Sequence, residues 1–478
     1  MKKYFKYLSA VFAAFCMTAC GGSDDDGQEP AKPQEQIALV SQSIAEGAEV
    51  DAFATTQLKL TFNKTLAAGT GSVTLNDKAV TPVVNAFDVT VPLTDLEEGK
   101  SYTVKLAAGA VVSNLDRTIA SPAVTVSFKT KAAEPLPPTG SLVDGKANDK
   151  VKALFAYLSD NYGKNILSST IADVNWNNKC AENVNKLTGK YPAINCYDFI
   201  HIYVPKNNWI DYTDITPVKT WADAGGIVSL MWHFNVPKDE NTTPGTDGSG
   251  VTCSPGETTF KAANALKSGT WENKWFYAEM DKVADVILKL QNEGIAAIWR
   301  PFHEAAGNTY ATGYKGGAWF WWGADGAETF KALWNAMYDH FQSKGIHNLI
   351  WVWTAQNTNN GQASGDKAFY PGNDKVDIIA RDYYGSSKSA IVTDWKELKE
   401  QYSGKMVTLG ECGYGTNNGK ITELPDMTDI WAAGGKYLYA MPWYGGDLKN
   451  STNTMVSEAW WKNFMSMSNV ITRDKVRY

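Results

Sequence analysis

The chain is poor in the residues that mark several common classes of protein. It has 6 cysteines and 5 histidines among 478 residues, without a Cys-x-x-Cys pair or a histidine-rich segment, so no spacing predicts a zinc site. Its formal net charge is -6, whereas a protein that binds nucleic acid needs a basic face. We therefore expect no metal, no cofactor and no nucleic-acid partner.

Aromatic residues, in contrast, are abundant. The chain holds 18 Trp, 22 Tyr and 18 Phe, and 44% of its residues are hydrophobic. A chain of this length and composition can form a large core and more than one domain. Flat rings fill cores, and they also stack well on the apolar faces of sugars.

The N-terminus has the order of a secretory signal. Lys2, Lys3 and Lys6 precede an apolar run from Leu8 to Met17, which is too short to span a bilayer as a mature helix. Residues 17–20, Met-Thr-Ala-Cys, resemble the bacterial lipobox, with Met where Leu is usual. The resemblance implies removal of residues 1–19 as a signal peptide and acylation of Cys20.

Residues 20–35 form an acidic and polar linker. Its first part, Gly21 to Asp26, is similar to the export signal of Bacteroides-type surface lipoproteins, and an ordinary solvated linker is the alternative. We expect a lipoprotein of the outer membrane that is held by a lipid anchor and exposed at the cell surface. An anchor that faces the periplasm is the alternative.

Four cysteines, namely Cys180, Cys196, Cys253 and Cys412, remain after this processing. An exported protein can keep disulfides. Cys180 and Cys196 are close enough in sequence to pair, but four cysteines allow three full pairings and the sequence does not choose among them. For Cys412 a buried thiol is the simplest interpretation.

Residues 36–131 alternate short β-branched and apolar runs with turn residues. Such runs, for example Gln57 to Phe62 and Ser101 to Leu106, predict a small all-β sandwich. The segment also looks like bacterial Ig-like modules, in which a strand end such as Phe62 to Leu66 is common. We interpret it as a spacer or accessory module, with carbohydrate binding as the alternative. The proline-rich linker 132–140 then marks a domain boundary.

Residues 141–478 alternate strand-like and helix-like segments. Helical patterns cover Ala278 to Asn292 and Ala327 to Ser343, among others. Eight runs read as strands: 165–168, 193–196, 227–233, 296–300, 348–353, 376–380, 406–410 and 436–443. Eight such alternations in about 340 residues predict an α/β fold, a (β/α)8 TIM barrel with loop insertions.

Two of these runs deliver a glutamate at the strand end. Glu304 follows the fourth strand and Glu411 follows the seventh. Catalytic residues of such barrels lie at the C-terminal ends of the strands, so we expect both carboxylates to meet at one mouth. An acid on a surface loop is the alternative for either residue taken alone.

The residues around Glu304 carry a family resemblance. Arg300-Pro301-Phe302-His303-Glu304, followed by Trp319-Phe320-Trp321-Trp322-Gly323, resembles glycoside hydrolase family 26, which is typified by β-mannanases. The match continues through residues 229–233, 351–357, 382–384, 409–413 and 441–443. One departure is the segment Asn308 to Lys315, which lengthens a loop and should reshape an outer subsite.

The resemblance implies a role for each matching residue. Glu304 corresponds to the general acid/base and Glu411 to the nucleophile of a retaining glycosidase, whose carboxyl groups sit about 5 to 5.5 Å apart. Arg300 would brace the glutamates through a charged hydrogen-bond network. His303 would orient a glutamate or a sugar hydroxyl, with a core histidine as the alternative.

Further positions match substrate-binding residues of the family. His233 and Asn357 correspond to sugar-contacting residues near the cleaved bond. Tyr384 corresponds to a tyrosine that hydrogen-bonds the nucleophile, Asp382 shares its strand face, and Tyr383 is the alternative by one residue. Trp319, Trp322 and Trp443 are candidates for sugar stacking, whereas Trp321 and Trp351 are expected in the core.

The sequence thus predicts a monomeric endo-β-1,4-mannanase that acts on mannan, glucomannan or galactomannan. An exo-acting mannobiohydrolase, or a β-1,3-xylanase or mixed-linkage glucanase of the same family, is the nearest alternative, because loops decide such preferences. A surface glycan-binding protein without catalysis is the alternative from another class. The presence of both Glu304 and Glu411 argues against it.

Overall fold

A computed structural model describes most of the chain after residue 35. The described ranges are 36–52, 55–94, 96–132, 140–172, 176–307, 317–356, 366–417, 420–445 and 450–478. The predicted signal peptide, Cys20, most of the linker 132–140, the loop Asn308 to Lys315 and Asn357 lie outside them. Within these ranges no helix is both long and apolar enough to cross a membrane.

Residues 36–131 form an all-β region. Its strands are β1 (Leu39–Gln42), β2 (Ala48–Val50), β3 (Gln57–Phe62), β4 (Leu66–Ala68), β5 (Val73–Leu75), β6 (Lys78–Ala79), β7 (Val83–Asn85), β8 (Asp88–Pro92), β9 (Ser101–Leu106), β10 (Val111–Ser113) and β11 (Val124–Thr130). They form sheets in the orders β1-β3-β8-β7, β2-β11-β9-β5-β6 and β10-β4. In β3 and β11 buried residues alternate with less buried ones, as expected for half-buried strands. An all-β domain is confirmed; its Ig-like character stays a prediction.

Eight parallel strands follow and close into a barrel. They are β12 (Ile166–Ile171), β13 (Ile194–Asp198), β14 (Ile227–Trp232), β17 (Ala297–Pro301), β18 (Leu349–Ala355), β19 (Ile378–Tyr384), β20 (Met406–Gly413) and β23 (Tyr439–Pro442). The order is β13-β14-β17-β18-β19-β20-β23-β12, and β12 pairs with β13 to complete the ring. Each of the eight predicted strands is present, so the TIM barrel is confirmed.

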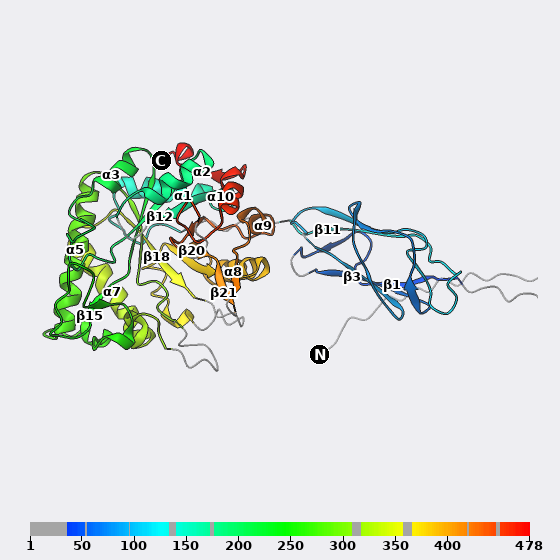
Figure 1. The fold of residues 1–478 in the computed structure, drawn as a ribbon, viewed down its shortest axis with the longest axis horizontal. Helices are drawn as coiled ribbons and strands as arrows, with labels where there is room; N and C mark the ends of the chain where they lie inside the picture. The colour runs from blue at the N-terminus through cyan, green and yellow to red at the C-terminus, as the bar shows by residue number, and fades with distance from the viewer. Residues whose placement is uncertain are drawn as a thin grey trace, which may run out of the picture. The chain divides into compact units, whose positions relative to one another are not determined.

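Helices surround these strands (Figure 1). They are α1 (Asp149–Asn161), α2 (Lys179–Thr188), α3 (Thr216–Asp223), α4 (Ala262–Ala265), α5 (Trp271–Asn292), α6 (Trp321–Ala324), α7 (Ala327–Ser343), α8 (Lys388–Gln401), α9 (Met427–Ala432) and α10 (Glu458–Ser466). Short strands β15 (Val236–Pro237), β16 (Val251–Thr252), β21 (Gly415–Asn417), β22 (Lys420–Thr422) and β24 (Val470–Ile471) lie in the connections or beside β12. The side chains of Asn148, Thr270, Ser387 and Ser457 cap α1, α5, α8 and α10.

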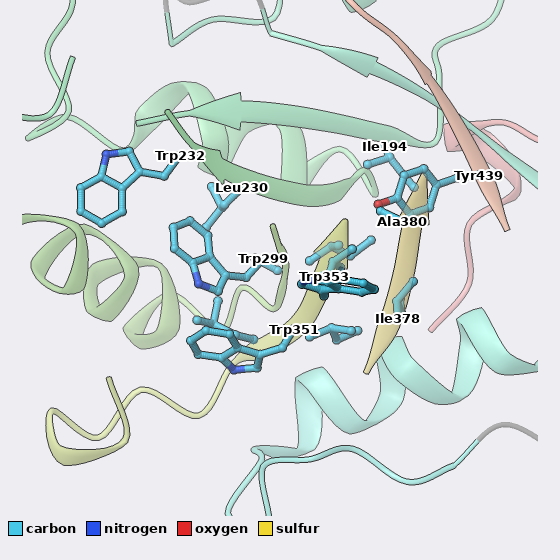
Figure 2. Close-up of a cluster of buried hydrophobic side chains, with 14 of the residues drawn as sticks. Ile194, Leu230, Trp232, Trp299, Trp351, Trp353, Ile378, Ala380 and Tyr439 are labelled. Carbon is cyan, nitrogen blue, oxygen red and sulfur yellow. The ribbon is translucent and has the colours of Figure 1, made fainter. Parts of the chain in front are cut away.

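Both faces of the barrel strands are buried, as parallel sheets require. Figure 2 shows Leu230, Trp299 and Trp351, from three neighbouring strands, gathered in the apolar layer between strands and helices. Inside the barrel a smaller cluster holds Ile171, Cys196, Met231 and Met441. The large indoles therefore fill the outer layer, and the narrow interior leaves room for a few polar side chains.

The pairing of Cys180 with Cys196, which the sequence left open, is absent from the structure, where both are free thiols. Cys196 belongs to the small cluster inside the barrel, whereas Cys180 lies on α2. No disulfide joins the cysteines of the described ranges. Cys412 is buried, as predicted.

We predict that Asp394→Ala lowers the free energy of unfolding by about 3 to 5 kcal/mol, because it leaves a buried cation without its partner. Arg381 on β19 donates from Nε to Asp394 Oδ2 of α8 at 2.5 Å, and both side chains are at most 5% exposed. Chemical denaturation would measure the loss. Asp223→Ala, which removes the exposed pair with Lys219, is the control and should change stability far less, because exposed ion pairs contribute little. Equal effects of the two substitutions would contradict the prediction.

Candidate active site

The segment after β17 has an unusual backbone. Phe302 and Glu304 both have positive φ angles, 48° and 52°, a conformation that costs a residue other than glycine on the order of 1 kcal/mol or more. Packing holds it in place, because the buried Phe302 ring stacks at 6.2 Å from Phe234 and 6.4 Å from Phe276. The chain turns sharply here and carries Glu304 to the barrel mouth.

Glu304 has a strongly raised pKa. Burial of its carboxyl is the main cause, and the negative charges of Asp382 and Glu411 raise the pKa further. The residue still keeps some exposed surface, so a ligand can reach it. The surroundings of Glu304 therefore favour the protonated carboxyl, the form from which a general acid donates.

Glu411 lies inside β20, and a local irregularity orients it. Strand β19 pairs with β20 so that Arg381 faces Leu409 and Asp382 faces Glu411, which leaves Gly410 as an extra residue. Such a bulge redirects the side chain beside it. A Cβ atom on Gly410 would lie 2.8 Å from Asp382 Oδ1 and 2.9 Å from Ala380 Cβ, so only glycine fits the bulge.

Two donors hold the Glu411 carboxylate. Arg300 donates from Nη2 to Oε1, and the Tyr384 hydroxyl donates to Oε2 at 2.6 Å. Glu411 is 4% exposed. Burial raises the pKa of Tyr384, so its hydroxyl serves as the donor, and Arg300 and Tyr384 together hold both carboxyl oxygens of Glu411 in place.

Arg300 also pairs with Asp382. Its Nη1 lies 3.1 Å from Asp382 Oδ2 and donates to Thr354 Oγ1 at 3.0 Å. Burial raises the pKa of Asp382, Arg300 opposes this rise, and the Glu411 charge adds to it. One guanidinium thus binds carboxylates from two neighbouring barrel strands, β19 and β20.

Two histidines lie beside this cluster, and their pKa values are shifted in opposite directions. His233 Nδ1 is 2.5 Å from Asp198 Oδ2, and its backbone N–H donates to Asp198 Oδ1 at 3.0 Å. Burial lowers the pKa of His233, but the Asp198 carboxylate outweighs it and the net shift is upward. His303, 4.3 Å away between ring centroids, has a pKa far below its usual value because of burial and then the charges of His233 and Arg300.

His303 faces Glu411. Its Nε2 lies 3.9 Å from Glu411 Oε1. Its Nδ1 is buried and makes no hydrogen bond to the described residues. His303 therefore lies beside the glutamate, where the sequence expected an orienting role.

The aromatic residues differ from the prediction at one position. Trp319 is 43% exposed, and Trp443 is partly exposed with its ring 5.6 Å from His233. Trp322 was predicted to stack on sugar, but it is completely buried and donates its indole N–H to the His303 carbonyl at 2.9 Å. Phe320 covers it with a parallel ring at 4.4 Å, so Phe320 is the ring that faces the site.

The structure also decides between Tyr384 and Tyr383, the two alternatives for the tyrosine that hydrogen-bonds Glu411. Tyr384 reaches Glu411, whereas the Tyr383 hydroxyl donates to the Ala390 carbonyl at 3.5 Å and its ring covers Arg381. Trp321 and Trp351 are buried, as expected. Asn357 lies outside the described residues, so its predicted role stays a prediction.

Asp198 is the functional residue that our sequence interpretation missed. It ends strand β13 and is 1% exposed. The signal was present, because an acid at the end of an apolar strand is the same pattern that identified Glu304 and Glu411. Among the described residues no group of three or more His, Cys, Asp or Glu side chains is arranged to hold a metal ion.

The chain is similar to known glycoside hydrolases. The model of glycosyl hydrolase family 26 matches residues 143–475. A mannan endo-1,4-β-mannosidase of Thermothelomyces thermophilus is 30% identical over 344 residues, 70% of this chain and 62% of that protein. The mannan endo-1,4-β-mannosidase A of Piromyces sp is 31% identical over 61% of this chain and 44% of that protein. The chain therefore spans less than two thirds of these relatives.

Solved structures agree with the barrel. The family 26 domain of an endo-β-mannanase/endo-β-glucanase from Prevotella bryantii is 53% identical, with a TM-score of 0.66 over 71% of this chain and 99% of that domain. A β-mannanase from a symbiotic protist of the termite Reticulitermes speratus, in complex with gluco-manno-oligosaccharide, is 28% identical, with a TM-score of 0.57 over 72% of this chain and 99% of that chain.

We predict that Asp198→Asn destabilises the protein more in acid than in base. The raised pKa of His233 means that its pairing with Asp198 stabilises the fold fully below the unfolded pKa of about 6.5. This contribution is lost as the pH rises through the higher folded value. Thermal unfolding at about pH 5.5 and about pH 8.5 should therefore show that the variant loses more stability relative to wild type in acid than in base.

Asp223→Asn is the control for this prediction. Its partner Lys219 keeps its charge across that pH range because its pKa is raised. Any loss of stability caused by Asp223→Asn should therefore be the same at both pH values. Equal deficits for Asp198→Asn at the two pH values would show that His233 does not carry the proton.

Proposed function

The chain belongs to glycoside hydrolase family 26, and from this membership and the site we propose that it is a retaining endo-β-1,4-mannanase. Its substrates are mannan, glucomannan or galactomannan. The observation that carries the proposal is the pair Glu304 and Glu411: burial and neighbouring charges raise the pKa of Glu304, whereas Arg300 and Tyr384 donate hydrogen bonds to the two carboxyl oxygens of Glu411. Two carboxyl groups at one barrel mouth in such different surroundings are the pattern of an acid and a nucleophile.

In the first step Glu304 donates its proton to the glycosidic oxygen while that oxygen leaves the anomeric carbon with the bonding electron pair. A carboxylate oxygen of Glu411 attacks the same carbon from the opposite face and forms the glycosyl ester. Charge at the sugar is oxocarbenium-like in between, and the ionised Glu411 stabilises it.

In the second step the glutamates exchange functions. Glu411 is now an ester without charge, so it no longer raises the pKa of Glu304, and the ionised Glu304 becomes the base. It takes a proton from water as the water oxygen attacks the anomeric carbon, and the ester bond breaks to return the Glu411 carboxylate. One water is consumed and the configuration is retained.

Several side chains support these steps. Arg300 and Tyr384 keep the Glu411 oxygens in place, so the nucleophile is oriented before substrate arrives. His233 and His303, whose pKa values are shifted up and down respectively, present two imidazoles to the sugar beside it. Phe320, Trp319 and Trp443 offer rings with exposed surface for stacking.

The substrate class is supported by the relatives. Those from Thermothelomyces thermophilus and Piromyces sp are named mannan endo-1,4-β-mannosidases, and the termite-symbiont enzyme was solved with a gluco-manno-oligosaccharide. We further propose that the enzyme is a monomer, and that a lipid on Cys20 holds it at the outer membrane, facing out of the cell. This second proposal rests on residues 17–26.

The product profile from linear mannan and galactomannan tests the carboxylate pair. Wild-type enzyme should release mixed oligosaccharides from the first minutes, and Glu304→Ala and Glu411→Ala should each lose at least about 1,000-fold in kcat, because each removes a group required in both steps. Mannobiose alone would instead indicate exo action. If the wild type cleaves no β-mannan, the proposed substrate is wrong, and xylan, mixed-linkage glucan and simple binding come next.

We expect Tyr384→Phe to lower kcat/KM on mannan by about 10- to 100-fold, because a hydrogen bond to a charged group contributes about 1.5 to 3 kcal/mol. The change removes the hydroxyl that donates to Glu411 Oε2. Tyr383→Phe is the matched control, because that hydroxyl is directed at α8, and it should stay within about twofold. Steady-state kinetics of both variants would decide, and a Tyr384→Phe enzyme with unchanged kcat/KM would exclude the proposed contact.

A further inference from the structure

Trp209 is exposed where the fold gives no reason for it. Among the described residues, Trp209 and Trp319 are the tryptophans with the greatest exposure, 40% and 43%. Trp319 belongs to the loop after strand four, whose aromatic residues the proposed function already uses. Trp209 lies in the connection between β13 and α3, outside the residues assigned to the site so far.

A small hairpin presents the Trp209 ring. Lys206 and Asp211 form a β-bridge closed by an ion pair of 2.8 Å. Inside it, the Asn207 side chain accepts the backbone N–H groups of Trp209 and Ile210 at 3.1 and 3.0 Å. The indole at the tip is thus held by ordered backbone on both sides, so little conformational freedom remains to be lost on binding.

Neighbouring loops fix the orientation of the ring. His201 contacts it edge-on, with ring centroids 5.1 Å apart and an angle of 86° between the planes. The loop between β14 and α5 passes close on another side, since a Cβ atom on Gly248 would lie 3.3 Å from Trp209 Cη2. The ring is braced on these sides and open on the remainder.

The hairpin is attached to the C-terminal end of β13, where Asp198 pairs with His233. Tyr212, which follows it, donates its hydroxyl to the Asp198 carbonyl at 2.7 Å and accepts the His201 N–H at 3.2 Å. Asp198 in turn binds His233 at 2.5 Å. Because the C-terminal ends of parallel strands share one face of the barrel, the loop that carries Trp209 leaves the same face of the barrel as His233.

We propose that Trp209 forms a distal sugar-binding subsite, in which its open ring face stacks on a pyranose unit of the polysaccharide several residues from the cleaved bond. The proposal rests on the proposed function for the identity of the chain, a β-linked mannan. An indole stacks on the apolar face of a sugar whatever its neighbours are. The subsite therefore favours long substrates over short ones.

The test compares Trp209→Ala with wild type in the full-length chain on mannotriose, mannohexaose and linear mannan. We expect kcat/KM to fall about three- to tenfold on mannohexaose and mannan. On mannotriose, which is too short to occupy the cleavage site and contact Trp209 at the same time, it should stay within about twofold. Trp209→Phe, which keeps a ring, should recover most of the loss. Phe87→Ala, on an aromatic residue 47% exposed in the N-terminal β-region, should behave as wild type on every substrate.

Two outcomes would overturn the subsite. Unchanged activity on mannohexaose would mean that no sugar binds Trp209, and an equal loss on mannotriose would mean that the ring only supports the fold. Retardation of the protein in a gel that contains galactomannan needs no cleavage, so it separates this proposal from the proposed function. Weaker retardation of Trp209→Ala supports the subsite even if wild type cleaves no mannan, whereas equal mobility of the two proteins rejects it.

Discussion

The Arg300 guanidinium is 2% exposed and binds carboxylates on two neighbouring strands, Asp382 and Glu411. A buried charge is tolerated only when it is paired and hydrogen-bonded, so each of the three groups depends on the other two. The third donor contact, to Thr354, ties strand five into the same cluster. Strands four to seven therefore meet around one cation, and the position of Glu411 follows from that of Arg300.

The same group of charges sets the directions of several pKa shifts. Burial is the main cause of the raised pKa of Glu304, and the charges of Asp382 and Glu411 raise it further, against the opposing effect of Arg300 and Arg381. At His233 burial lowers the pKa, but the Asp198 carboxylate outweighs it. His233 and Arg300 in turn add to the effect of burial that lowers the pKa of His303.

Most of the fold, and the two glutamates, could be predicted from the sequence because they depend on short-range patterns. Eight apolar runs gave eight strands, and acids at strand ends marked the mouth. Regular two-residue alternation does not describe the chain where the backbone is irregular. The positive φ angles of Phe302 and Glu304 and the extra residue Gly410 decide which way side chains face, and no periodicity reveals them. Trp322 was misassigned for a related reason: neighbouring aromatic residues look alike in sequence, and only packing shows that Phe320 covers it.

These backbone irregularities are needed to bring the side chains of the site together. A regular strand sends successive side chains to opposite faces, so it cannot place Arg300, His303 and Glu304 around one point. Two left-handed residues make this possible, and their cost is offset by the stacked rings of Phe234, Phe276 and Phe302 behind them. At strand seven the bulge does the same for Glu411, with glycine required because Asp382 and Ala380 leave no space for a side chain. The aromatic layer behind strand four thus has a second function beyond stability: it holds the strained turn that positions the acid.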